Sequence, residues 1–403
     1  MRRLTLSLAA ILLAASLALA RSSVDFDPLR PEILADAETL ALVGGAVVIV
    51  DHGESYVWTF GTSDAERRVP VDLDTRFSTG SVAKPLVAYW LDQQAFDTGI
   101  TLAALWPELD LGQAGAVTVE QAVDQTSGFV RDDGAWVGRT VNSEAAAAIL
   151  RQYTPLAPAG ERFTYNSVVF ALAAAGAARD LGVDIPWMPS SDPSATSFEL
   201  TLAGDLAAVE PFDHGIMSAA VNARLSAAQL EALLPDLISW VDDAQALRLG
   251  EDAPERSCCP LGRSLRYANG WFIEQFEGYD VYSHPGSAIG GTAAIMVVPE
   301  LALGAAVLVN QDHGDVFANS ARYKIVLQAL GRDTGQAGVL IRRAMAQRAA
   351  WSALAAGLGA QGEPIEYGAL RWPTARIPGS EHCRIVLRGP LLGQYIGTDC
   401  TKP

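Results

Sequence analysis

Ser81 and Lys84 form the most reactive pair that the sequence offers. Residues 77–85 read FSTGSVAKP, so the serine stands three positions before the lysine. Residues three apart share one face of a helix, which allows the lysine amine to reach the serine hydroxyl. Pro85 fits such a helix only if the helix begins near Ser81, and the serine then lies at the positive end of the helix dipole. A serine beside an amine is an activated nucleophile, but this spacing alone more often marks a solvated helix start.

Two later segments could complete such a site. Residues 158–167 read PAGERFTYNS, which places the phenol of Tyr165 between a turn and an alanine-rich helix. Residues 282–291 read YSHPGSAIGG, in which His284 and Gly286 follow a strand-like run and open a glycine-rich turn. Taken alone, Tyr165 is more simply a half-buried aromatic residue at a helix start.

Together these segments resemble the serine β-lactamases and penicillin-recognising D,D-peptidases, above all the class C-like branch that also holds esterases and D-aminopeptidases. The resemblance spans roughly residues 40–315 in the family's order. An ordered set of motifs is far more specific than any one of them. The set also includes Thr126-Ser127-Gly128, Gly215-Ile216-Met217-Ser218, Tyr267–Phe272 and Val307–Asn310.

The resemblance implies a role for each matching residue. Ser81 resembles the acylated nucleophile, Lys84 the amine that shuttles its proton, and Tyr165 the tyrosine that assists deprotonation and protonates the leaving group. The backbone N–H groups of Ser81 and Ser287 would form the oxyanion hole, which is typically the largest electrostatic contribution to acyl transfer. We therefore expect Ser81, Lys84, Tyr165 and Ser287 to be catalytic.

Ser167, His284 and Gly286 are the residues that we expect to bind substrate, and two of them depart from the family pattern. Ser167 stands where the family's Tyr-x-Asn has its asparagine, and His284-Pro285-Gly286 replaces the Lys-Thr-Gly of lactamases. A shorter hydroxyl holds an acylamide side chain less well than an amide does. Histidine, mostly neutral near pH 7, replaces a permanent cation, although His-x-Gly also occurs among the esterase and aminopeptidase members. A third departure, Gln125 in place of the histidine before Thr126, is expected to be structural.

Strand-like runs at both ends of the chain enclose a helical middle. Residues 43–60 read as a β-hairpin, and four more apolar runs follow between residues 270 and 310. From about residue 81 to 247 the apolar spacing is mostly helical. Neither set of strands can bury its apolar face alone. We predict an α/β (α+β) fold in which both sets form one antiparallel sheet flanked by helices, with an inserted helical subdomain, as in the β-lactamase/transpeptidase architecture.

The first 20 residues have the pattern of a secretory signal peptide. Arg2 and Arg3 precede an apolar run over residues 4–17, and Ala18-Leu19-Ala20 is a small-x-small cleavage site. The run is short for a membrane anchor, which needs about 20 residues. We predict a signal peptide at 1–20, a serine hydrolase domain at 21–333 and a C-terminal extension at 334–403. The mature protein would be periplasmic or secreted, with no transmembrane segment.

The net charge and the positions of histidine and cysteine limit the kinds of partner and cofactor that we expect. The chain has 403 residues and a formal net charge of −17, which argues against binding to a nucleic-acid backbone. Its five histidines are scattered and no cysteine pair has the spacing of a zinc site, so we expect neither metal nor cofactor. The expected partner is a small-molecule or peptide substrate.

Four cysteines, at positions 258, 259, 383 and 400, allow two disulfides in three possible pairings. A bridge between the neighbours Cys258 and Cys259 would be strained, whereas Cys383–Cys400 would close a short local loop. For an exported chain we expect at least one disulfide, with Cys383–Cys400 the leading candidate.

These observations favour an exported serine hydrolase that works through an acyl-enzyme on Ser81 and cleaves an ester or a peptide-type amide. A β-lactamase or D,D-carboxypeptidase is the alternative within the same chemistry. A catalytically silent peptidoglycan-binding or sensor protein on the same fold is the alternative from another class, favoured by Ser167 and opposed by the intact Ser81, Lys84 and Tyr165.

Overall fold

The hairpin near the start of the chain and the strands near its end form one sheet in the computed structural model. β1 (Gly44–Asp51) pairs with β2 (Glu54–Asp64) on one side and with β13 (Leu303–Val309) on the other. The sheet has nine strands in the order β3-β2-β1-β13-β12-β11-β10-β9-β8, and the predicted antiparallel sheet is therefore confirmed. The remaining strands are β3 (Val69–Pro70), β8 (Glu251–Asp252), β9 (Arg263–Ala268), β10 (Trp271–Phe276), β11 (Tyr279–Ala288) and β12 (Gly291–Val298).

The structure describes most of the chain up to residue 345. The described ranges are 23–64, 68–187, 197–200, 206–209, 213–243, 251–252, 258–312 and 314–345, and the backbone of four later strands. The predicted signal peptide at 1–20 lies outside the described residues.

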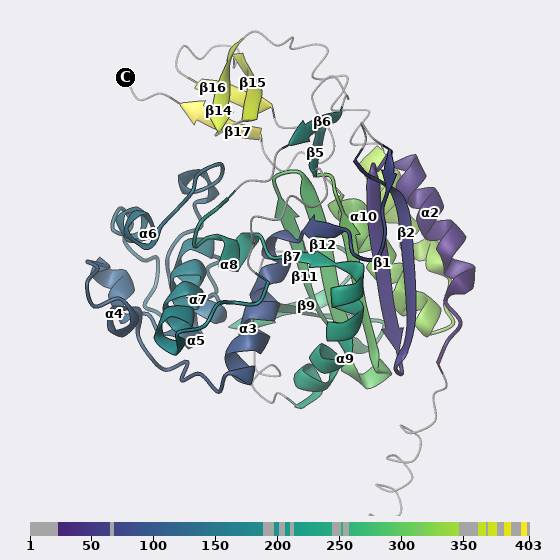
Figure 1. The fold of residues 1–403 in the computed structure, drawn as a ribbon, viewed down its shortest axis with the longest axis horizontal. Helices are drawn as coiled ribbons and strands as arrows, with labels where there is room; N and C mark the ends of the chain where they lie inside the picture. The colour runs from purple at the N-terminus through teal and green to yellow at the C-terminus, as the bar shows by residue number, and fades with distance from the viewer. Residues whose placement is uncertain are drawn as a thin grey trace, which may run out of the picture.

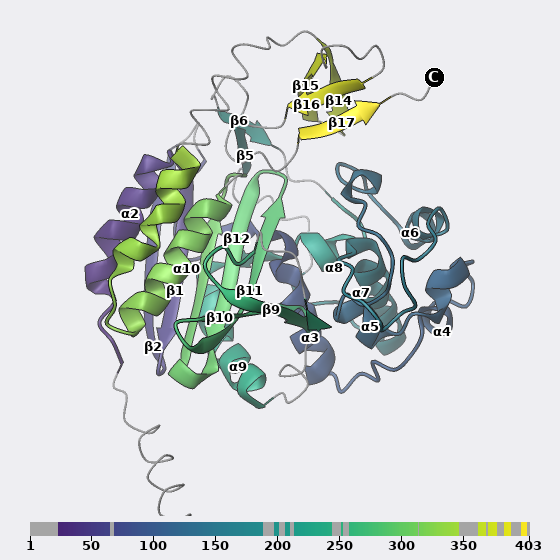
Figure 2. The ribbon, with the colours of Figure 1, turned by 180° about the vertical axis from the view of Figure 1, so that it is seen from behind.

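Helices cover both faces of the sheet. α2 (Arg30–Thr39) and α10 (Asp315–Ala329) lie on one face and α9 (Ala227–Asp243) lies on the other (Figures 1 and 2). Successive side chains of a strand point to opposite faces, and β1 is buried on both: Val47 and Ile49 pack with α2 and α10, whereas Val48 and Val50 pack with α9. This double burial makes β1 a continuous apolar run instead of an alternating one.

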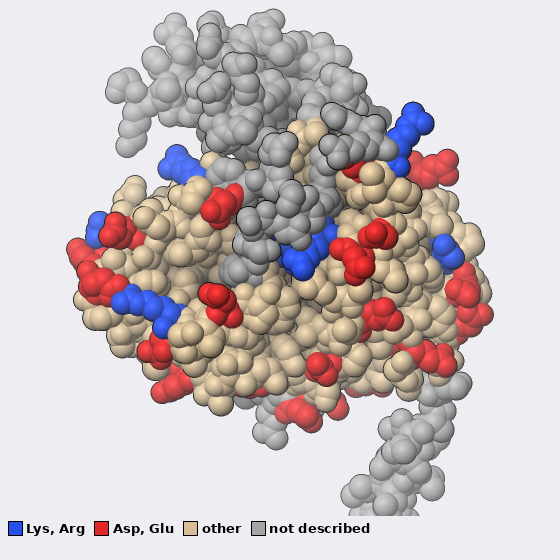
Figure 3. All heavy atoms as spheres, in the orientation of Figure 1, with Lys and Arg blue, Asp and Glu red and all other residues tan. Residues whose placement is uncertain are grey.

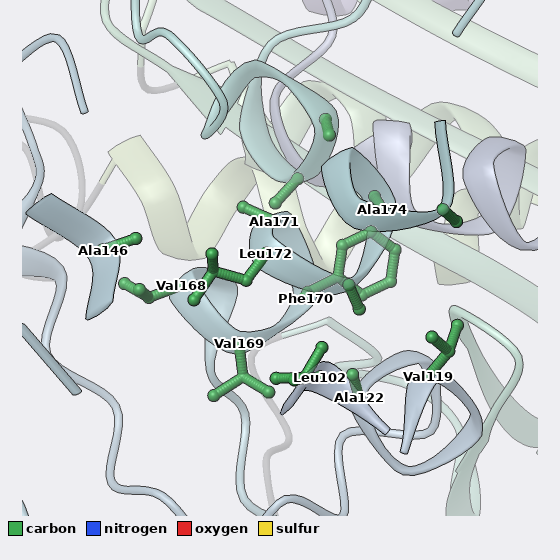
Figure 4. Close-up of a cluster of buried hydrophobic side chains, with 14 of the residues drawn as sticks. Leu102, Val119, Ala122, Ala146, Val168, Val169, Phe170, Ala171, Leu172 and Ala174 are labelled. Carbon is green, nitrogen blue, oxygen red and sulfur yellow. The ribbon is translucent and has the colours of Figure 1, made fainter. Parts of the chain in front are cut away.

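A helical lobe is inserted between β4 and β7, as predicted. Its core is built around α7, whose apolar side chains meet Leu102, Val119 and Ala122 from neighbouring helices (Figure 4). Alanines let these short helices approach closely while leaving few polar groups to satisfy. The lobe contains α3 (Ala83–Gln93), α4 (Leu102–Leu105), α5 (Val119–Val123), α6 (Ser143–Leu150), α7 (Ser167–Leu181) and α8 (Ser218–Val221).

Two small sheets connect the lobe to the large sheet. β4 (Arg76–Ser78) pairs with β7 (Arg224–Ser226), which directly precedes α9. β5 (Ser197–Leu200) pairs with β6 (Leu206–Val209). The first of these sheets holds the chain immediately before Ser81.

The Arg/Ala-rich segment that the sequence predicts to be a helix over residues 339–358 is helical where the structure describes it. Residues 338–345 are helical, and Leu340, Ile341 and Ala344 pack into the core shared by α2 and α10. A separate antiparallel sheet follows (top of Figure 1), and the boundary at residue 333 stays a prediction. Its strands are β14 (Gly362–Tyr367), β15 (Leu370–Arg376), β16 (Cys383–Leu387) and β17 (Ile396–Cys400).

The structure confirms the expectation of at least one disulfide. The bond joins Cys258 and Cys259, which leaves the expected Cys383–Cys400 pairing open. Both residues are buried against aromatic side chains, which explains how an adjacent pair is held together. Cys383 and Cys400 are paired positions of β16 and β17, and their bridge stays a prediction because their side chains lie outside the described set.

Candidate active site

Ser81 lies in a tight turn that leads directly into α3. The turn covers Gly80–Val82 and follows the end of β4. Thr79 anchors it, because both its amide and its hydroxyl donate to the carbonyl of Ala223, at 2.9 and 2.7 Å. The predicted helix start is thus confirmed, and Pro85 falls in the first turn of α3, where it removes no helical hydrogen bond.

Lys84 connects three parts of the site. Its side chain is 0% exposed, and its Nζ donates to Ser81 Oγ at 3.2 Å, Ser167 Oγ at 3.2 Å and the Ala220 carbonyl at 2.7 Å. An ammonium has three N–H donors, enough for these three acceptors. The acceptors come from the Gly80–Val82 turn, from α7 and from α8, so the lysine position depends on all three elements.

Ser167 and Tyr165 flank the residue that caps α7. Asn166 Oδ1 accepts from the amides of Val168 and Val169, at 2.9 and 3.0 Å, which fixes the start of the helix. Gln125 Oε1 accepts from the Asn166 amide, which gives Gln125 a structural role. The Ser167 hydroxyl accepts a hydrogen bond from Lys84, whereas the sequence predicts that it binds substrate.

Tyr165 belongs to an aromatic cluster at the edge of the site. Its ring centroid lies 4.7 Å from Lys84 Nζ and 6.4 Å from the Phe272 centroid, and Tyr267 packs against both rings. The Cys258–Cys259 disulfide completes this buried cluster. Packing from β9 and β10 therefore holds the Tyr165 ring beside the lysine amine.

His284 is buried and uncharged. Burial lowers its pKa to about 3, and the nearby Lys84 charge adds to this effect. Its Nδ1 lies 2.7 Å from the Pro285 carbonyl and its Nε2 lies 3.4 Å from the Tyr267 hydroxyl. Nδ1 therefore donates to the carbonyl and Nε2 accepts from the phenol. A direct hydrogen bond to substrate would have to replace one of these contacts.

The start of the Gly80–Val82 turn packs directly against the end of β11. Gly80 has a φ of +55°, and a Cβ there would collide with the backbone amide of Ser287. A Cβ on Gly286 would collide with the Thr79 carbonyl. Glycine at both positions thus lets the amides of Ser81 and Ser287 lie on neighbouring segments, as an oxyanion hole requires.

All seven predicted site residues lie on these adjoining segments. Two groups that contact the site residues could not be predicted from the motifs. One is the Ala220 carbonyl, which any residue could supply, and the other is Arg131, whose guanidinium lies 5.0 Å from the Tyr165 ring centroid. Only the TSG turn just before Arg131 pointed to this part of the chain. Across the described residues, no three His, Cys, Asp or Glu side chains are grouped as a metal site would require.

Residues 33–184 match the family model Beta-lactamase. A penicillin-binding protein homologue from Pyrococcus abyssi, described as octameric, has a similar structure, with 18% identity over 93% of this chain and 90% of its own, and a TM-score of 0.66. The chain has the β-lactamase fold. The resemblance read from the motifs is confirmed.

Two further β-lactamase-fold structures each cover about three quarters of the chain. A class C β-lactamase from Rhodobacter sphaeroides shares 18% identity over 74% of this chain and 98% of its own, with a TM-score of 0.55. A β-lactamase/D-alanine carboxypeptidase from Pseudomonas syringae shares 15% over 75% and 99%, with a TM-score of 0.57. A sequence search of curated proteins finds no match. No helix in the described parts of this β-lactamase-fold chain could cross a membrane.

Proposed function

We propose that the protein is a serine hydrolase that forms an acyl-enzyme on Ser81 and acts, after export, on an ester or a peptide-type amide. The β-lactamase fold indicates a serine hydrolase. The observation that carries the proposal is the 3.2 Å hydrogen bond between Lys84 Nζ and Ser81 Oγ, made where solvent is excluded from the amine.

The proposed reaction has two halves. Ser81 Oγ bonds to the substrate carbonyl carbon while its proton passes, by way of the Lys84 ammonium, to the Tyr165 phenolate, and the amides of Ser81 and Ser287 receive the negative oxygen. Collapse of this intermediate breaks the bond to the leaving group, which takes a proton from Tyr165. Water then attacks the ester on Ser81 and gives a proton to Tyr165. The bond between the carbonyl carbon and Ser81 Oγ breaks, and Oγ takes back that proton as the acid is released. The N-terminal end of α3 favours the alkoxide character of Ser81 throughout.

The surroundings of β11 support a substrate without a carboxylate at that side. His284 is uncharged and bonded to Pro285 and Tyr267, and Pro285 has no hydroxyl to donate. A carboxylate-bearing substrate would lose two charge-assisted hydrogen bonds that a lysine and a threonine would supply, each worth about 1.5–3 kcal/mol. An uncharged short-chain ester has no carboxylate, so it loses no hydrogen bond when histidine and proline stand in place of that lysine and threonine.

A β-lactamase or D,D-carboxypeptidase is the second candidate. The observation that favours it is the fold shared with the Pseudomonas syringae protein, which is described as both a β-lactamase and a D-alanine carboxypeptidase. The two candidates share the acyl-enzyme and differ in the substrate group that β11 must bind.

Active-site labelling tests the proposal. Purified mature protein is treated with a fluorophosphonate probe, and its intact mass is compared with that of Ser81→Ala. We expect one adduct on the wild type and none on the variant, together with hydrolysis of p-nitrophenyl acetate. Labelling that survives in Ser81→Ala would assign the wrong serine. No labelling and no turnover would favour the silent binding protein, and rapid cephalosporin hydrolysis would favour the second candidate.

A further inference from the structure

Arg131 is a cation beside Tyr165 that the proposed mechanism does not use. Its guanidinium carbon lies 5.0 Å from the Tyr165 ring centroid, close enough for a cation–π contact. The side chain is 40% exposed and pairs with Asp133, at 2.7 Å from Nε to Oδ2. The position of this arginine on the catalytic ring needs an explanation.

The loop that carries Arg131 is tied to the start of α7. The Val130 carbonyl accepts from Asn166 Nδ2 at 2.7 Å, and the Gly128 carbonyl accepts from the Leu156 amide at 2.8 Å. Asn166 is the neighbour of Tyr165 in the chain. Arg131 and Tyr165 are therefore held by the same capping residue, and the distance between them does not depend on a long flexible connection.

Two cations of the described residues lie against the Tyr165 ring. Lys84 at the start of α3 and Arg131 on the loop are both cations within 5.0 Å of the ring centroid. β11 contributes His284, which is uncharged, and β9 contributes the phenol of Tyr267. β10 contributes Phe272, and Asp133 is the carboxylate beside Arg131. The disulfide-bonded cysteines do not titrate.

We propose that Arg131 is a positioning residue that stabilises the ionised form of Tyr165 and thereby sets the acid limb of the pH profile. The inference rests on the proposed role of Tyr165 as a proton acceptor. A guanidinium stays charged at all working pH values, so its attraction for a phenolate is constant. A cation on the ring favours the phenolate over the neutral phenol, and Asp133 offsets part of that attraction. With His284 uncharged, Arg131 supplies the second positive charge beside the phenol.

Removing the Arg131 cation and removing the Asp133 carboxylate should shift the Tyr165 pKa in opposite directions. Arg131→Gln removes the cation, so the Tyr165 pKa and the acid limb of kcat/KM should rise by about half a pH unit, or roughly threefold in the ionisation constant. Asp133→Asn removes the offsetting carboxylate, so both should fall by a similar amount. Arg131→Lys keeps the charge and should restore most of the wild-type profile. Arg151→Gln and Asp110→Asn, which break an exposed ion pair elsewhere on the lobe, are the matched controls.

Two readouts keep the test decisive. The first is the pH dependence of p-nitrophenyl acetate hydrolysis, an uncharged substrate that Arg131 has no charge to bind. The second is a ¹³Cζ-tyrosine NMR titration, in which the Tyr165 signal is assigned by its loss in Tyr165→Phe and no turnover is needed.

Shifts of opposite sign in Arg131→Gln and Asp133→Asn, in both readouts, would support the proposal. Equal losses of kcat in Arg131→Gln and Arg131→Lys with an unmoved limb would overturn it in favour of simple loop support. An effect confined to KM for anionic esters would overturn it in favour of substrate binding. If the NMR shifts appear while Ser81 resists labelling, the electrostatic link stands and the proposed hydrolase function fails.

Discussion

Lys84 Nζ donates to Ser81 Oγ at 3.2 Å from a position fully removed from solvent. The amine contacts the Ser81 hydroxyl directly, and two further hydrogen bonds go to protein oxygens of Ser167 and Ala220. A buried amine held in this way cannot swing toward solvent without leaving two acceptors unpaired. We therefore expect Ser81 and Lys84 to act together as one functional unit.

Substitution of either member of this unit should remove most of the activity. Ser81→Ala and Lys84→Met should each lower kcat for a p-nitrophenyl ester by about three orders of magnitude or more, and the double variant should cost little beyond either single change. The measurement is steady-state kinetics, with far-UV circular dichroism as the control for folding. Additive losses in the double variant would show that the two residues act independently.

Ser167 should act through Lys84. Ser167→Ala removes one acceptor of the buried amine, so we expect kcat to fall by about tenfold, equivalent to one hydrogen bond to a charged group. Ser167→Asn restores an acceptor at that position and should recover part of the loss. If both variants change KM for acylamide substrates and leave kcat untouched, Ser167 binds substrate, as the motif resemblance implies.

Substrate preference should follow β11. The unmodified protein should hydrolyse small p-nitrophenyl esters. Its kcat/KM for penicillins and cephalosporins should be roughly two to four orders of magnitude below that of a site with the lysine and threonine contacts. His284→Lys with Pro285→Thr should move the preference toward carboxylate-bearing substrates. Pro285→Thr alone is the control, because it adds the hydroxyl without the cation. Unchanged selectivity in the double variant would mean that another element recognises the carboxylate.

Acid should destabilise the fold through its buried histidines. Burial lowers the pKa of His284 to about 3 and that of His214 to about 4, where Asp213 opposes the shift and Arg224 adds to it. As pH falls below the ordinary value of 6.5, the unfolded chain takes up these protons first, so the free energy of unfolding decreases down to the folded-state pKa values. Each histidine adds a slope of about 1.4 kcal/mol per pH unit in that window.

Urea unfolding between pH 7 and pH 4 measures this slope. His214→Asn should reduce the slope by about the contribution of one histidine, independently of how much the substitution lowers the free energy of unfolding at pH 7. A slope unchanged in both His214→Asn and His284→Asn would show that carboxylates alone govern the acid response.

The two cysteine pairs should differ in what they contribute. Cys383 and Cys400 are 17 positions apart and are paired positions of β16 and β17, so their bridge should stabilise the chain by about 3 kcal/mol in the chain-entropy model. Cys258 and Cys259 enclose almost no chain, so replacing both should cost little through the unfolded state and act instead on the packing around Tyr165. Non-reduced peptide mapping followed by urea unfolding of each double serine variant checks both statements. Free thiols at 383 and 400 in material from the periplasm would contradict the first.

The face seen in Figure 3 shows scattered acidic side chains, as expected for a chain of net charge −17. Charge, leader pattern and motif order are properties that the sequence determines alone, because each depends on residue type and linear spacing. The S-x-x-K spacing fixed the Ser81–Lys84 contact for the same reason: three residues of helix bring the two side chains together wherever the helix lies. The early hairpin and the late strands were also predictable, since their apolar runs are continuous.

Only the tertiary structure decided what surrounds these residues. His284 loses its charge because β9, β10 and α3 pack around it, and no pattern in residues 282–291 reports that burial. Ala220 serves Lys84 through a backbone carbonyl, which every residue possesses, and Arg131 reaches Tyr165 because Asn166 ties two loops together. Cys258 and Cys259 are joined inside an aromatic cluster gathered from separate segments. Short residue spacings predict which neighbouring side chains meet. Burial, charge state and the choice of hydrogen-bond partner arise from contacts between segments that are distant in the chain.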